Sequence, residues 1–116
     1  LLKTLVVRRG DGDYLFVIVP GDRAIDWAKL RGFLGVRRMT LPDAAEAKEA
    51  TGYERGTNTP FGAIHQWPVI ADETIAAKTD VSLGAGAHGV SVTLSAAALI
   101  DTLAATVADV TKPAEG

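Results

Sequence analysis

The opening residues of the chain, LLKTLVVRRGDGDYLFVIVP (residues 1–20), decide how its fold begins. Two runs rich in Val, Leu and aromatic residues, 2–8 and 14–19, flank a turn cluster of Gly and Asp, which predicts a β-hairpin. Residues 17–19 are apolar without interruption, which favours a second strand buried on both faces. Pro20 and Gly21 end that strand.

The next segment predicts a helix over residues 23–34. Asp22 is a plausible N-cap, and Gly35 suits the C-terminal cap. The apolar stripe of this helix would comprise Ile25, Ala28 with Trp27, and Phe33. Residues 36–41 then resemble a short strand. Asp43 and Glu46 form a capping-box pattern for a second helix, which ends at Gly52.

The second half of the chain predicts further strands over residues 69–71, 80–83 and 90–94. A single helical turn fits residues 73–77, and Ser95 is placed to cap a last helix. The apolar residues spaced to face the core from that helix are Leu99, Ile100, Leu103 and Val107. Residues 112–116 resemble a tail. The order of elements predicts a mixed α/β domain.

Composition limits the class of protein. A chain of 116 residues with 47% hydrophobic residues suits one globular domain. The absence of cysteine excludes disulfides, thiolate metal sites and a Cys nucleophile. A net charge of -2 argues against broad nonspecific nucleic-acid binding. No apolar run approaches the ~18 residues of a membrane span, and cytoplasmic localisation is expected. The chain begins at Leu1 inside a strand, so we expect an N-terminal segment to be missing.

Residues 51–68 form the longest stretch without a helix or strand period, TGYERGTNTPFGAIHQWP. Its aromatics argue against a disordered linker, and its glycines and prolines can direct several backbone N–H groups one way. Long irregular loops inside compact domains often bind ligands. The loop is therefore a candidate floor for a small-molecule or nucleotide-end pocket.

Several residues carry candidate chemistry, each with a structural alternative. Lys3, among apolar neighbours, is either an edge-strand charge that discourages aggregation or a cation facing a pocket. Gly56 to Pro60 is either an ordinary turn or a cradle of backbone amides. The glycine-rich residues 84–89 lack a phosphate-loop string. His65 and His88 make no convincing metal site. A triad of Ser82, His88 and Asp72 lacks the context of a nucleophile elbow.

These motifs, taken in order, resemble the YbaK/ProRS-associated editing domain family, from Lys3 to about Val110. The matching segments are Lys3 to Val7, Val19 to Asp22, Thr51 to Tyr53, Gly56 to Gly62, Pro68 to Asp72, and Val81 to Gly86. The resemblance implies a mixed, mostly antiparallel sheet curled into a partial barrel with helices packed outside. It divides the chain into an editing domain, 1–110, and a C-terminal tail, 111–116.

The resemblance also implies a function, that of a freestanding trans-editing aminoacyl-tRNA deacylase. It assigns catalysis to Lys3 and Gly56, and substrate binding to Thr57, Asn58, Thr59, Pro60, Ser82 and His88. Ser91 stands where some relatives have Asp, which puts a carboxylate role there in doubt. No metal or cofactor is expected. The expected partner is aminoacyl-tRNA, and an aminoacyl-tRNA synthetase is a further candidate. Neither DNA nor a membrane is expected as a partner.

Small mischarged amino acids such as Ala, Ser, Cys or Thr are the expected acyl groups, because a sieve admits what is small enough. Two other functions stay open. One is a non-catalytic module of the same fold that holds a tRNA end or a synthetase. The other is a hydrolase of a different small ester, which the net negative charge mildly favours because tRNA affinity normally depends on basic surface.

Overall fold

The predicted hairpin is confirmed in the computed structural model, which describes residues 2–10, 13–39, 67–84 and 91–114. Strand β1 (Leu2–Gly10) pairs antiparallel with β2 (Asp13–Pro20). Every residue of β2 from Leu15 to Pro20 is buried. The uninterrupted apolar run is explained by this position, since β2 lies inside a sheet that is covered on both faces.

That main sheet has four strands in the order β1-β2-β4-β7. Strands β4 (Val69–Asp72) and β7 (Thr106–Ala108) continue it with parallel pairing, so only its first pair is antiparallel. Two antiparallel pairs complete the described strands: β3 (Arg23–Ile25) with β8 (Thr111–Pro113), and β5 (Asp80–Gly84) with β6 (Ser91–Ser95).

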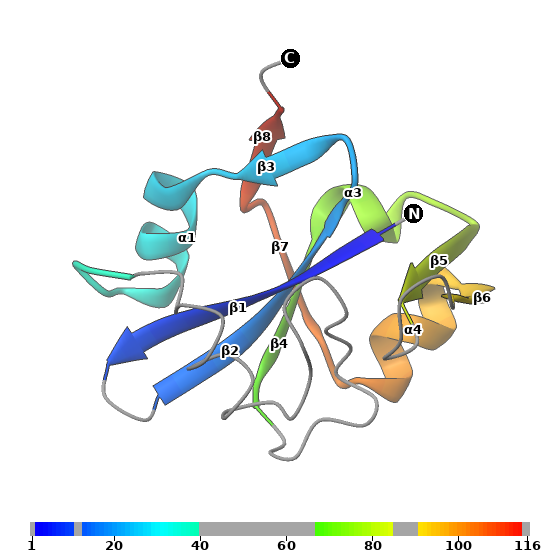
Figure 1. The fold of residues 1–116 in the computed structure, drawn as a ribbon, viewed down its shortest axis with the longest axis horizontal. Helices are drawn as coiled ribbons and strands as arrows, with labels where there is room; N and C mark the ends of the chain where they lie inside the picture. Colours follow the sequence, from blue (N-terminus) through cyan, green and yellow to red (C-terminus); the bar gives the residue numbers. More distant parts are fainter. Residues whose placement is uncertain (1, 11–12, 40–66, 85–90, 115–116) are drawn as a thin grey trace.

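The expected curling of the sheet into a partial barrel is therefore wrong for the part of the chain that the structure describes, whereas the mostly antiparallel pairing is confirmed, since three of the five strand pairs are antiparallel. The described strands form three separate sheets (Figure 1). The physical reason lies in the connections: β4 runs directly into α3 (Glu73–Ala76), and β6 runs directly into α4 (Ala96–Thr102). Helix α3 thus separates β4 from β5, and α4 separates β6 from β7, so the β5–β6 pair stands apart from the main sheet. The mixed α/β class is confirmed.

Helix α1 (Trp27–Leu34) begins later than the sequence predicted. Residues 23–25 are withdrawn from it by their pairing with β8, so Asp26 rather than Asp22 is the N-cap and accepts a hydrogen bond from the Lys29 N–H at 3.1 Å. Leu30 is its buried residue, whereas Phe33 of the predicted stripe is 46% exposed. Gly35 caps its C-terminus at φ 70°, as predicted.

Three further predictions differ from the structure. Residues 36–39 are not in a strand, and the rest of the strand predicted at 36–41 lies outside the described residues. The last helix is capped by Ser95 as expected, but it ends at Thr102 because Ala104 adopts φ 49°. Val107 is consequently on β7, where it is 40% exposed. Of the expected tail, 111–116, Thr111–Pro113 form β8.

The core consists of two clusters, one on each face of the main sheet. The first, which we call the β5 side, joins Val6, Phe16 and Ile18 to residues of α3, β5 and α4 such as Ile75, Leu83 and Leu99. The second, the α1 side, joins Val7, Val17 and Val19 to Ile25, Leu30 and Val110. Figure 1 shows α1 at one end of the sheet and the β5–β6 pair with α4 at the other.

A buried carboxylate connects β4 to the C-terminal strands. Asp72 has no exposed surface, and its Oδ1 accepts a hydrogen bond from the Val110 N–H at 3.0 Å. Its Oδ2 accepts from the Thr74 N–H at 3.1 Å and from the Thr74 hydroxyl. Burial raises the pKa of Asp72, but hydrogen bonds from Thr74, Val110 and Thr111 outweigh it, and the net effect lowers this pKa.

Candidate functional site

Lys3 and Ser82 lie on neighbouring strands and turn away from the same core cluster. Leu2 and Val6 on β1, and Val81 and Leu83 on β5, all belong to the β5-side cluster. Because successive residues of a strand point to opposite faces, Lys3 and Ser82 both point away from it. Strands β1 and β5 pack against each other. Both predicted site residues therefore lie outside this core cluster, on two strands that pack against each other.

Lys3 is exposed and its backbone pairs with that of Val19. Strand β1 is an edge strand of the main sheet, so the position also satisfies the structural alternative, a charge that protects an edge. Exposure leaves the ammonium group free to meet an anionic substrate. The geometry therefore permits both functions of this lysine, and its role stays a prediction.

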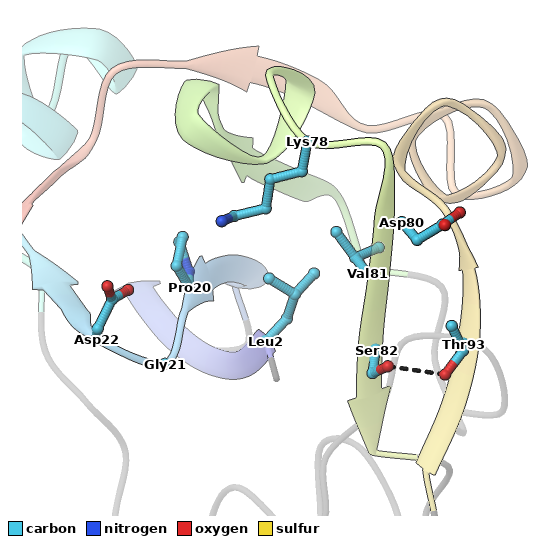
Figure 2. Close-up of a pocket in the computed structure, with 9 residues that line it drawn as sticks. All are labelled: Leu2, Pro20, Gly21, Asp22, Lys78, Asp80, Val81, Ser82 and Thr93. Carbon is cyan, nitrogen blue, oxygen red and sulfur yellow. Dashed lines mark hydrogen bonds between the residues drawn. The ribbon is translucent and has the colours of Figure 1, made fainter.

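A pocket of about 600 Å³ lies where the ends of β1 and β2 face β5 and β6 (Figure 2). Its apolar wall includes Leu2, Pro20 and Val81. Its polar wall is formed by Asp22, Lys78, Asp80, Ser82 and Thr93. The Oγ atoms of Ser82 and Thr93 are hydrogen-bonded across the β5–β6 pair at 2.8 Å. A small polar group entering the pocket would find hydroxyl donors and acceptors on one wall.

Lys78 is a cation of this pocket that the sequence did not reveal. It follows α3, and Figure 2 shows its side chain extending across the pocket toward the end of β2. Lys3 is not among the described lining residues. No motif surrounds Lys78 in the sequence; only the position of α3 beside the sheet brings it here. Any test of Lys3 therefore needs Lys78 as its comparison.

Thr4 is a second residue that sequence reasoning missed. Its Oγ1 is buried, and among the described residues it is the side-chain atom left without a hydrogen-bond partner. An unsatisfied buried hydroxyl costs about 1–3 kcal/mol, so it is a group to explain. The available signal was a hydroxyl in an otherwise apolar strand, beside Lys3.

Most of the predicted loop chemistry lies outside the described residues. This applies to Gly56, Thr57, Asn58, Thr59, Pro60, His65 and His88. The described end of the long loop is structural: the rings of Trp67 and Tyr14 lie 5.3 Å apart, and the Pro68 carbonyl accepts a hydrogen bond from the Phe16 N–H at 2.8 Å. Ser91 is the β6 residue whose backbone pairs with Gly84.

Neither a metal site nor a membrane-spanning helix is found in the described parts of the chain. No group of three or more His, Asp or Glu side chains there is arranged to hold a metal ion. None of the helices described is both long and apolar enough to cross a membrane. What the described residues do provide is a lysine, a hydroxyl pair and a mixed-charge pocket on a mixed α/β scaffold.

This mixed α/β scaffold matches a known family of domains. The family model described as "Aminoacyl-tRNA editing domain" matches residues 1–102. The chain belongs to this family, and the resemblance stated from its motifs is confirmed.

Similar proteins include synthetases and a freestanding protein. The chain is 33% identical over 88 residues to the proline–tRNA ligase of Heliobacterium modesticaldum, covering 76% of this chain but only 15% of the ligase. It is 25% identical over 100 residues to an Enterococcus faecalis protein named "Putative Cys-tRNA(Pro)/Cys-tRNA(Cys) deacylase EbsC", covering 86% of this chain and 61% of that protein.

Solved structures share the fold. The crystal structure of hypothetical protein APE2540 matches with a TM-score of 0.88 and 27% identity, over 97% of this chain and 74% of that one. A structure described as "a putative trans-editing enzyme for prolyl tRNA synthetase" matches with the same TM-score at 23% identity, over 96% of this chain and 69% of that one. The second likeness bears on the fold alone.

Proposed function

We propose that this protein is a trans-editing deacylase, which hydrolyses the ester of a small mischarged amino acid such as Ala, Ser, Cys or Thr on tRNA. The observation that carries the proposal is the family match over residues 1–102, which includes both Lys3 and Ser82. The two residues lie on strands that pack against each other, outside the core, which supports it. Cytoplasmic localisation is part of the proposal.

The reaction suits a site without a strong nucleophile. A water oxygen attacks the ester carbonyl carbon and gives a tetrahedral intermediate. The bond between that carbon and the ribose oxygen then breaks, the amino acid leaves with a free carboxyl group, and the ribose oxygen takes a proton. An aminoacyl ester is already activated, so the protein needs chiefly to position the ester and to stabilise developing negative charge.

Each predicted residue has a role in this scheme. Lys3 orients the ester or the terminal phosphate of the tRNA through its exposed ammonium group. The backbone amides around Gly56, with Thr57 to Pro60, hold the carbonyl oxygen or the terminal ribose. Ser82 and His88 shape the pocket, and the hydroxyl pair of Ser82 and Thr93 offers hydrogen bonds to a polar group. A ribose hydroxyl of the substrate assists the attacking water.

Pocket size then determines which acyl groups react. Each methylene that a hydrophobic pocket accepts or rejects is worth about 1–3 kcal/mol, so small acyl groups are separated from larger ones by exclusion. Leu2, Pro20 and Val81 supply such an apolar wall in the described pocket.

A deacylation panel tests the proposal. tRNAs charged with labelled Ala, Ser, Cys, Thr and a large amino acid are incubated with the protein, and release of the label is followed. We expect at least one small acyl group to be cleared and the large one to be retained. Clearance of none, with intact binding of tRNA, would instead identify a non-catalytic tRNA-binding module. Clearance of simple esters but of no aminoacyl-tRNA would identify a different hydrolase.

Three matched variants locate the chemistry. Lys3→Ala should reduce the deacylation rate by about 100-fold or more, the usual cost of one stabilising donor. Lys78→Ala makes the same change in the described pocket and should cost severalfold at most. Lys112→Ala makes it on β8, where the exposed side chain is outside the pocket, and should have no effect. A loss confined to Lys78→Ala would show that Lys3 had been given the wrong role.

A further inference from the structure

Helix α1 and the residues after it carry a local excess of positive charge. Residues 27–42 contain four basic and no acidic residues, in a chain whose net charge is -2. The basic residues are Lys29, Arg31, Arg37 and Arg38. A concentration of one sign in so short a segment produces a local potential that the net charge conceals.

One of these four cations is engaged within the fold. The Lys29 ammonium group donates to Asp109 Oδ1 at 2.9 Å and to the Thr111 carbonyl at 3.1 Å. The hydrogen bond with Asp109 raises the pKa of Lys29. Lys29 therefore joins the start of α1 to the C-terminal strands, and it is not available to a partner.

The three arginines are different. In the ranges that the structure describes, Arg31, Arg37 and Arg38 take part in no ion pair. Arg37 and Arg38 are exposed and Arg31 is half-buried. Helix α1 ends at Leu34 and is capped by Gly35. The N–H groups of Gly35 and Val36 both donate to the Arg31 carbonyl, so the chain turns back beside the last helical turn. Phe33, 46% exposed, lies in that turn.

This arginine patch lies on the same side of the main sheet as Lys3. Leu5 and Val7 pack in the α1-side cluster with Leu30. Lys3, Leu5 and Val7 are every second residue along β1, so their side chains point to the same face of the sheet. A nucleic acid whose end is at Lys3 can therefore meet the patch without crossing the sheet.

We propose that Arg31, Arg37 and Arg38, with Phe33 beside them, bind the sugar-phosphate backbone of the substrate tRNA near its acceptor end. The inference rests on the proposed function, because it takes the RNA as the carrier of the ester. Arginine forks match phosphate oxygens, and an exposed aromatic ring can stack on an unpaired base. Attraction to the negative end of the helix dipole explains a cation in the last turn, such as Arg31, but not two more beyond it.

The patch makes the net charge of -2 compatible with tRNA binding. Affinity for RNA depends on the few phosphates that the protein neutralises, not on the charge of the whole chain. Each phosphate contact contributes about 0.7–0.9 to the slope of log affinity against log salt concentration. Three arginine contacts thus contribute roughly 2 to 3 to this slope.

The test compares two triple variants. In one, Arg31, Arg37 and Arg38 are replaced by Ala; in the other, the same three residues are replaced by Lys, which keeps the charge. Binding of uncharged tRNA is measured by fluorescence anisotropy across a salt series, and kcat and KM are measured on a mischarged tRNA. The Ala variant should lower the salt slope by roughly 2 to 3 and raise KM, with kcat unchanged. The Lys variant should retain most of the affinity. Phe33→Ala should weaken binding without changing the slope.

An unchanged salt slope in the Ala variant would overturn the inference, as would equal losses in the Ala and Lys variants. The two levels of proposal fail separately. If the unmodified protein clears mischarged tRNA and the Ala variant does so equally well, the patch is wrong and the deacylase stands. If the protein clears no ester, the proposed deacylase activity is wrong, and the proposed role of the arginine patch is then tested by tRNA binding alone. Failure of the unmodified protein to bind tRNA would reject that role.

Discussion

Replacing Asp72 by Asn should destabilise the protein, because the buried carboxylate accepts hydrogen bonds both from the start of α3 and from the segment between β7 and β8. Its two oxygens accept from different partners: Oδ1 from the Val110 N–H, and Oδ2 from the N–H and hydroxyl of Thr74. An asparagine amide has one oxygen and one NH₂ group. In either orientation, the NH₂ group faces a buried donor where an acceptor had been.

The magnitude follows from these contacts. A hydrogen bond to a charged group contributes about 1.5–3 kcal/mol, and a donor left unsatisfied in the interior costs about 1–3 kcal/mol. Loss of the Val110 bond alone, the smaller of the two outcomes, predicts a decrease of about 1.5–3 kcal/mol in the free energy of unfolding. This is a large part of the roughly 5–15 kcal/mol that stabilises a typical domain.

Urea denaturation followed by circular dichroism measures this change. Asp101→Asn is the matched control, because Asp101 is exposed on α4 and the same substitution there should change stability by less than about 0.5 kcal/mol. A midpoint for Asp72→Asn that equals the control would refute the reasoning.

The pH dependence provides a second check. The pKa of Asp72 in the folded protein is lowered, since the hydrogen bonds outweigh the effect of burial. The stabilisation from the carboxylate is therefore fully present above the unfolded pKa of about 3.9 and is lost as pH falls through the folded pKa. The difference between the protein and Asp72→Asn should be constant from about pH 5 to 8 and shrink in acid. A difference that grows toward low pH would contradict the assignment.

Three further substitutions test other parts of the account. Gly35→Ala should lower stability by roughly 1 kcal/mol in urea denaturation, because φ 70° is costly for a residue with a Cβ; no change would mean that the cap is not formed in solution. Thr4→Val should leave stability unchanged or raise it by about 1 kcal/mol, because the buried Oγ1 lacks a partner among the described residues; a loss above 1 kcal/mol would reveal a partner. Ser82→Ala removes the hydrogen bond to Thr93 from an exposed pair and should change stability by less than about 0.5 kcal/mol. An increase in the KM for mischarged tRNA would therefore report on substrate contact, and an unchanged KM would remove Ser82 from the site.

Local sequence signals predicted the elements that depend on local physics. The β1–β2 hairpin, the Gly35 cap and the Ser95 cap all follow from residues adjacent in the chain. The start of α1 did not, because Asp22 and Asp26 are equally good caps by residue type. Pairing of β3 with β8, about 90 positions along the chain, selects Asp26.

The same distinction applies to the candidate site. Lys3 stood out as a charge in an apolar strand, and Ser82 through its motif. Lys78 lies in the pocket only because α3 packs beside the sheet, and Asp72 is held by Val110, 38 positions away. Separate sheets rather than a partial barrel also could not be read from the strands, because strand pairing between distant segments leaves no local pattern.

Single-turnover deacylation decides whether the assigned chemistry is correct. The protein and Lys3→Ala are each mixed in excess with tRNA carrying the small acyl group that is cleared fastest, and release of the amino acid is timed. We expect rapid release by the protein and release slower by about 100-fold or more by Lys3→Ala. Equal rates for the two proteins would contradict this expectation.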